Sequence, residues 1–189
     1  FFVMLCVAYA LTFFSEVGGL AHLFNLAKER SGDRAGSLAL ALLAGTSVVG
    51  RLLGGLIVLR VPTKVFSMIL VVLQAIALLC ISLSHSSAAI VASAVFLGVS
   101  VGNLLMLQPL LLAEAYGVRE YAQIYGFNQL IGTIGVASGP FVLGFVHDGA
   151  SYTVAFVVAA IGSLLGFLAF LAAGPITGPL HLWGNAPVV

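Results

Sequence analysis

The sequence predicts an all-α membrane protein with six transmembrane helices, and three observations support this prediction. Of its 189 residues, 61% are hydrophobic, and the mean hydropathy is +1.20. Charged residues make up 7% of the chain, whereas about 25% of an average soluble domain is charged. Six runs are long enough to cross a bilayer core, which takes roughly 20 apolar residues. A water-soluble globule of this size is therefore excluded.

The expected helices follow from the apolar runs at residues 1–26, 36–59, 65–84, 88–113, 124–147 and 153–173. A bilayer core offers no water to unpaired backbone groups, so each run closes its hydrogen bonds within a helix. The first run is too long for a signal peptide and lacks a basic leader and a cleavage site.

Short polar segments separate the expected helices. Residues 28–34 (KERSGDR) follow the first helix, and Pro62 ends any helix between the second and third runs. Residues 85–87 (HSS) join the third run to the fourth, and residues 147–152 (HDGASY) have the composition of a turn. The tail at residues 174–189 contains prolines and glycines and is expected to end without a packed element.

The charge balance and the cysteines exclude other classes of protein. The net charge is +1, whereas a nucleic-acid-binding protein needs a dense basic patch. Cys6 and Cys80 both lie in apolar runs, so no disulfide framework is expected. The sequence shows no Cys/His cluster with metal-ligand spacing, so neither a metal nor another cofactor is expected.

The loop charges leave the orientation in the membrane open. Cytoplasmic loops carry an excess of Lys and Arg. Here each face holds the same number of basic loop residues, namely Arg60, Lys64 and Arg119 on one face and Lys28, Arg30 and Arg34 on the other.

Two charges lie inside the expected spans. At 1.5 Å per residue, Glu16 lies about 15 Å from the loop end of its helix and Arg51 about 12 Å from the end of its own. Burial of either charge costs at least about 2.5–3.5 kcal/mol, so each should face a partner or a wet cavity. One interpretation is a structural ion pair that docks two helices. The other makes Arg51 the counter-ion of a substrate and Glu16 the nearby group that takes up a coupled proton.

Uncharged polar residues also recur at helical spacing. An amide in lipid needs a partner, so Asn103, Asn128 and Gln129, together with Tyr125, are candidates for lining a substrate cavity. The glycines that follow them are expected to allow close helix packing. His22, near the end of the first helix, is either an interfacial histidine or a proton relay.

Four loop charges, Arg60, Lys64, Glu114 and Arg119, share one membrane face. They are candidates for a latch that joins loops and breaks during a conformational change. Ordinary solvated loop charges are the alternative interpretation.

Residues 98–102 (GVSVG) match the G-x-S-x-G pattern of serine hydrolases. A serine nucleophile needs a base within hydrogen-bond reach. The six-span rhomboid proteases keep that histidine in their sixth span, and residues 153–173 contain none. The motif also lies inside a span rather than at a strand-to-helix turn. The protein is therefore not expected to be an enzyme.

Residues 18–23 (GGLAHL) and 50–56 (GRLLGGL) are similar to helices 7 and 8 of one transporter family, and residues 121–126 (YAQIYG) and 139–156 (GPFVLGFVHDGASYTVAF) to its helices 10–12. The family is the major facilitator superfamily, and the resemblance is to its monocarboxylate and oxalate–formate branch. The resemblance extends over nearly all of the chain.

This resemblance implies the C-terminal half of a twelve-helix transporter, built from two inverted three-helix repeats, with the substrate near the midplane between the halves. Phe1 opens within an apolar run, so a six-helix N-terminal half is expected to precede it. The resemblance also implies that the loops after the second and fourth helices are cytoplasmic. It implies that Arg51, which matches the family's helix-8 arginine, binds the carboxylate of the substrate.

Three features depart from the family pattern. Ser47 stands where some members have an acid one turn before that arginine, which leaves Glu16 to substitute for it. Residues 124–147 lack the lysine of the oxalate–formate members, so a dicarboxylate is not expected. Residues 60–64 lack the aspartate that usually precedes the basic residues of this loop, which would weaken a cytoplasmic latch.

The sequence therefore predicts a secondary active transporter that moves a small organic anion, expected to be a monocarboxylate, by alternating access in the plasma (inner) membrane. Its expected partners are this anion, the lipid bilayer and the N-terminal half of the same chain. Proton coupling through Glu16 and His22 is the accompanying hypothesis. The alternatives are a non-transporting membrane scaffold or receptor, and a half-size transporter that pairs with a copy of itself.

Overall fold

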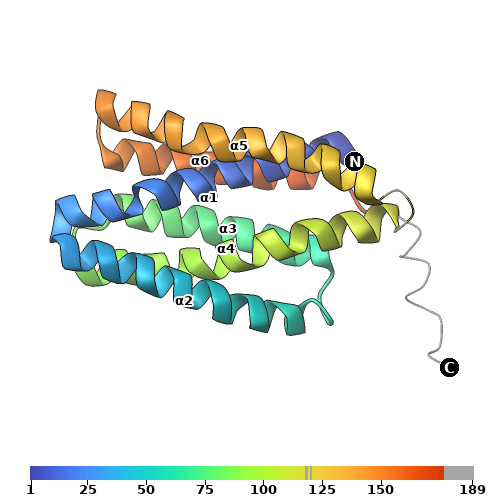
Figure 1. The fold of residues 1–189 in the computed structure, drawn as a ribbon, viewed down its shortest axis with the longest axis horizontal. Coiled ribbons are helices and arrows are strands. Elements are labelled where there is room, and N and C mark those ends of the chain that lie inside the picture. Colours follow the sequence, from blue (N-terminus) through green and yellow to red (C-terminus); the bar gives the residue numbers. More distant parts are fainter. Residues whose placement is uncertain (118, 120, 177–189) are drawn as a thin grey trace.

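The computed structural model describes residues 1–117, 119 and 121–176, and in these residues the chain forms six helices (Figure 1). All six are long and apolar enough to cross a membrane, which confirms the predicted fold class. The helices are α1 (Phe2–Ser31), α2 (Asp33–Ile57), α3 (Thr63–Leu83), α4 (Ser87–Tyr116), α5 (Tyr121–Gly149) and α6 (Tyr152–Ala172). Most of the tail expected at 174–189 lies outside the described residues.

Helix α1 continues five residues past the end expected at residue 26, because its last turn binds two other helices. The Arg30 guanidinium donates hydrogen bonds to the carbonyl oxygens of Ile81 (2.9 Å) and Ser84 (2.6 Å) and to Thr153 Oγ1 (2.7 Å). The last carbonyls of a helix have no partner within it and carry partial negative charge, so a cation is favourable at the end of α3.

One residue, Gly32, separates α1 from α2. Its φ of 86° is in the region that favours glycine, and its N–H donates to the carbonyl oxygen of Lys28 at 2.9 Å. The Lys28 ammonium lies 2.9 Å from the Asp33 carboxylate across this connection.

The six helices form two three-helix repeats that exchange partners. Helix α1 packs against α5 and α6, and in the same way α4 packs against α2 and α3. Helices α3 and α6 contact each other. In Figure 1, α5 and α2 lie on opposite sides of the bundle, with α1, α3 and α4 between them. Because three short connections reverse the chain between α1 and α4, the second repeat runs inverted to the first.

The inner helices bury their residues in two apolar clusters. One lies toward the α1–α2 connection and includes Leu26, Ile81 and Phe156; the other lies toward the chain start and includes Leu5 and Phe170. Helices α2 and α5 bury much smaller shares of their residues than the other four. These two helices are therefore the sides of the bundle with the most uncovered surface.

Glycines set the closest helix contacts. A Cβ at Gly135 of α5 would overlap the backbone carbonyl oxygen of Ala10 on α1, and one at Gly102 of α4 would overlap that of Ser47 on α2. Small residues allow this approach between membrane helices. The two sites occupy equivalent helix pairs, α1–α5 and α4–α2, of the two repeats.

Candidate substrate-binding site

Arg51 lies on the uncovered side of α2 and is exposed. Its Nε donates a hydrogen bond to the carbonyl oxygen of Gly102 on α4 at 3.0 Å. Its terminal Nη atoms have no hydrogen-bond partner within the part of the chain that the structure describes. The guanidinium is therefore held from one edge while its other edge stays available to an anion.

The surface of α2 around Arg51 combines small and large residues. Large apolar side chains are exposed on this helix, namely Leu38, Leu42, Val48, Val49, Leu52, Leu53 and Leu56. Small residues lie at helical spacing with Arg51, namely Ala44, Ser47 and Gly55, and Val48, which is 63% exposed, borders them. Arg51 thus belongs to a narrow stripe with a small side chain one turn before it and a glycine one turn after it.

Asn103 lies behind Arg51 at the same α2–α4 contact. Its Nδ2 donates to the carbonyl oxygens of Gly50 (2.9 Å) and Val99 (2.8 Å), so both amide hydrogens are used within the protein. Adjacent residues of the two helices therefore bond reciprocally, since Arg51 binds Gly102 and Asn103 binds Gly50. This pair of bonds fixes the position from which Arg51 projects.

The polar residues of α5 are divided between interior and surface. Asn128 is fully buried; its Nδ2 donates to Cys6 Sγ at 3.2 Å, and its Oδ1 accepts from Gln108 Nε2. Asn128 thus joins α1, α4 and α5 and does not line an open cavity as expected. Gln129 is exposed. Tyr125 is half-buried, and its ring stacks on that of Tyr121 with 5.4 Å between centroids.

The expected binding residues form two separate groups. Arg51 and Asn103 lie at the contact between α2 and α4, whereas Tyr125, Asn128 and Gln129 lie on α5. Helices α2 and α5 do not contact each other in the described part of the chain. The six helices therefore present the Arg51 guanidinium and the polar residues of α5 on two different sides.

The ion pair considered between Glu16 and Arg51 is absent. Among the described residues, the ion pairs are Lys28–Asp33 and His147–Asp148. Glu16 is 2% exposed, and its Oε2 has no partner in the part of the chain that the structure describes. The residues one turn to either side of it, Thr12 and Gly19, contact Gln74 and Leu78 of α3. Glu16 is therefore inside the bundle, and Arg51 bonds to α4 instead.

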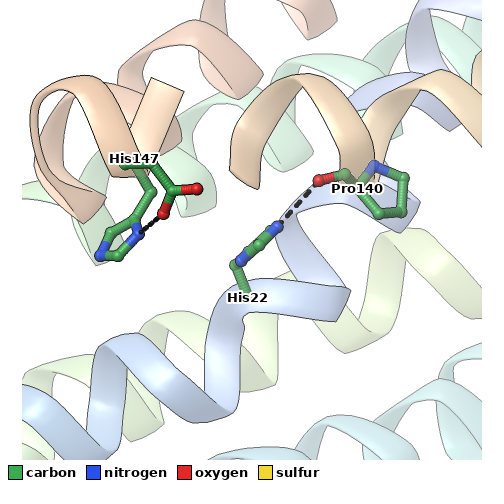
Figure 2. A network of polar contacts seen from close by, with 4 residues as sticks. His22, Pro140 and His147 are labelled. Atoms are coloured by element: carbon green, nitrogen blue, oxygen red, sulfur yellow. Dashed lines mark hydrogen bonds and ion pairs between the residues drawn. The ribbon is translucent and has the colours of Figure 1, made fainter. Parts of the chain in front are cut away.

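His22 lies at the contact between α1 and α5 (Figure 2). Its Nε2 is 3.0 Å from the carbonyl oxygen of Pro140, and its buried Nδ1 has no partner within residues 1–117, 119 and 121–176. The neighbouring His147 has its Nδ1 3.1 Å from an Asp148 carboxylate oxygen, and its ring stacks on Tyr152. His22 therefore joins two helices, and its role as a proton relay stays a prediction.

Among the described residues, the four latch candidates form no ion pairs with one another. Two of them make contacts with other residues instead. Glu114 accepts a hydrogen bond from Thr63 Oγ1, which joins α4 to α3. Lys64 Nζ donates to the carbonyl oxygen of Gly174 and lies 5.7 Å from the centroid of the Phe1 ring. Arg60 and Arg119 are exposed.

Sequence analysis missed the helix contacts of two polar side chains, those of the buried Gln74 and the half-buried Arg30. Gln74 is fully buried, and its Nε2 donates to the carbonyl oxygen of Thr12 (3.0 Å) and to Ser163 Oγ (2.9 Å). A single amide within the strongly apolar run 65–84 was a signal of such a contact, because an unpaired amide in lipid is costly.

The six helices, each long and apolar enough to cross a membrane, define a multi-pass membrane protein. The chain belongs to the Major Facilitator Superfamily, whose family model matches residues 1–184. It is 31% identical over 151 residues to "Monocarboxylate transporter 10" of Danio rerio, an alignment that covers 77% of this chain and 30% of that relative. The chain thus spans about a third of the relative's length. Membership confirms the resemblance predicted from sequence and agrees with a transporter rather than an enzyme.

Replacement of Asn128 with alanine is expected to destabilise the bundle. It removes the acceptor of Gln108 and the donor to Cys6, and a buried polar group left unpaired costs about 1–3 kcal/mol. Thermal unfolding of the detergent-solubilised protein should show a lower midpoint for this variant. The control is Gln123→Ala, an exposed amide on the same helix; equal midpoints for the two variants would contradict the prediction.

Proposed function

We propose that this chain is the C-terminal half of a secondary active transporter that carries a small organic anion, specifically a monocarboxylate. The observation that carries the proposal is the guanidinium of Arg51, anchored through Nε to Gly102 while its terminal nitrogens are free among the described residues. A guanidinium edge binds the two oxygens of a carboxylate in parallel.

The burial pattern supports a substrate site that is completed by protein opposite α2 and α5. Both helices have a side with small or polar residues in addition to a side with large apolar ones. On α5, Gly126, Gln129 and Thr133 are exposed at helical spacing, next to Phe127, Leu130 and Ile134. In the proposal, the six-helix N-terminal half covers the small and polar sides, and lipid covers the apolar ones.

Transport then follows from rocking of the two halves around a substrate near the midplane. Arg51 neutralises the carboxylate, and Gln129 supplies an amide from the other side of the cavity. One carboxylate matches one free guanidinium edge, which favours a monocarboxylate over a dicarboxylate. The printed name of the relative is consistent with this class of substrate. We place the transporter in the plasma (inner) membrane.

The test is uptake of radiolabelled monocarboxylates, such as lactate and pyruvate, by proteoliposomes that contain the complete protein of which this chain is part. Uptake above that of protein-free vesicles, inhibited by unlabelled monocarboxylates more than by oxalate, is the expected result. Uptake equal to that of protein-free vesicles for a broad panel of monocarboxylates would instead favour a scaffold or receptor.

A further inference from the structure

A carboxyl group without a hydrogen-bond donor lies inside the bundle, apart from Arg51. Glu16 is 2% exposed and occupies the middle of α1. Among the described residues, its buried Oε2 has no hydrogen-bond partner. An ionised carboxylate in such a place is very unfavourable unless a cation or several donors face it, and the group otherwise becomes neutral by binding a proton.

A second buried oxygen without a donor adjoins the same turn of α1. Gln74 uses its Nε2 to bind the Thr12 carbonyl oxygen at 3.0 Å and Ser163 Oγ at 2.9 Å, and among the described residues its Oε1 has no partner. Thr12 lies one helical turn before Glu16. One turn after Glu16, Gly19 packs against Leu78 of α3. Glu16 therefore lies on α1 between two contacts with α3, and the first of these contacts is made by the same amide whose oxygen lacks a donor.

The charged groups of the helices around α1 have partners elsewhere or lie toward helix ends. Titratable side chains of α1 near this turn are Tyr9, two turns earlier, and His22, which bonds to Pro140. Within the spans of the helices packed against α1, Arg51 of α2 bonds to Gly102, and Cys80 of α3 is exposed. The other titratable groups of these helices lie toward helix ends, namely Asp33 and Arg34 on α2, Lys64 on α3, Glu114 and Tyr116 on α4, Tyr121, Tyr125, His147 and Asp148 on α5, and Tyr152 on α6.

We propose that Glu16 is a proton-binding site of the transporter, in which its neutral carboxyl group donates a hydrogen bond to Gln74 Oε1. This inference rests on the proposed transport function and adds the site of its coupled proton. One bound proton turns an acceptor into a donor and so satisfies two buried oxygens at once. The site is in the interior of one half, separate from the guanidinium that binds the substrate.

Release of this proton has a structural consequence. The carboxylate that remains must be hydrated, because the described residues place neither a cation nor a hydrogen-bond donor beside it. Water reaches it when α1 separates from α3 at the turn that contains Thr12 and Glu16. Binding and release of the proton therefore change the contact between α1 and α3, which is how the proton is coupled to the movement of helices.

Infrared spectroscopy of the complete purified protein tests the proton site without a transport assay. The wild type should show the band of a protonated buried carboxyl group at neutral pH. That band should disappear in Glu16→Gln and persist in Glu29→Gln, a matched control at an exposed position of the same helix. Lack of the band in the wild type, or its persistence in Glu16→Gln, overturns the proposal whatever the substrate is.

Gln74→Leu tests the partner. Loss of the acceptor should shift the carboxyl band to higher frequency, since hydrogen bonding of the acid lowers it; an unshifted band would remove Gln74 from the proposal. In proteoliposomes, an inward proton gradient should stimulate uptake by the wild type and by Glu29→Gln. Glu16→Gln should lose this stimulation and keep substrate exchange. Stimulation of Glu16→Gln equal to that of the wild type overturns the coupling role.

Discussion

Arg51→Gln is expected to abolish substrate uptake while leaving the protein folded. Glutamine keeps a polar side chain of intermediate length but removes the charge that neutralises the carboxylate. Charge-assisted hydrogen bonds contribute about 1.5–3 kcal/mol, and a bidentate guanidinium–carboxylate pair makes two of them. The loss therefore amounts to at least a factor of 100 in affinity, which is enough to remove uptake at micromolar substrate. Initial rates in proteoliposomes over a range of substrate concentrations measure it.

Two further variants sharpen this experiment. Arg51→Lys keeps the charge but lacks the planar edge, so it should retain weak uptake with a raised KM. Arg34→Gln removes an exposed arginine from the first turn of the same helix and should transport like the wild type. Normal uptake by Arg51→Gln would show that the anion binds elsewhere, and loss of uptake by Arg34→Gln would show a general effect of charge on this helix.

Gly135→Val is expected to prevent correct packing of the bundle. A Cβ there would overlap the carbonyl oxygen of Ala10 and also meet its backbone carbons, so no flexible side chain can move aside. Overpacking typically costs about 1–3 kcal/mol and occasionally more. Because the obstruction is backbone in the middle of the α1–α5 contact, we expect an effect at or above the upper end. The measurement is the fraction of solubilised protein that elutes as a single symmetric peak in size-exclusion chromatography.

Gly45→Val is the matched control for this substitution. It introduces the same side chain into the interior of another helix, on the side of α2 that exposes Leu42 and Val49, where a Cβ meets nothing within 4 Å. The cost of a β-branched residue within a helix is then equal for both variants, and the difference between them reports the packing alone. Equal yields of monodisperse protein would mean that α1 and α5 do not approach as closely as described.

The number and type of helices could be predicted from the sequence, because the length of an apolar run is decided by the thickness of a bilayer. The end of α1 could not, since residues 28–30 are charged, yet Arg30 finds its partners on α3 and α6. Those partners are far away in the sequence, so no local pattern reveals them.

The candidate site could be predicted in part. The sequence singled out Arg51 by its charge within a span, and the structure describes it as exposed. It could not tell that Glu16 faces the interior, because spacing along a helix gives depth but not the identity of the neighbouring helix. Asn128 and Gln129 show the same limit: they are adjacent on α5, one fully buried and one exposed. Which of them points inward depends on where α1 and α4 lie.

The single glycine between α1 and α2 restricts the ways in which the six-helix bundle can move. Consecutive Cα atoms are about 3.8 Å apart, so a one-residue connection has almost no slack. Sliding of α1 along its axis past α2 by even one helical turn would require a terminal turn to unwind, including the one in which Lys28 pairs with Asp33. The two helices therefore form a helical hairpin whose members cannot slide independently. A tilt of α1 that opens its contact with α3 carries α2 with it, together with the arginine that α2 bears.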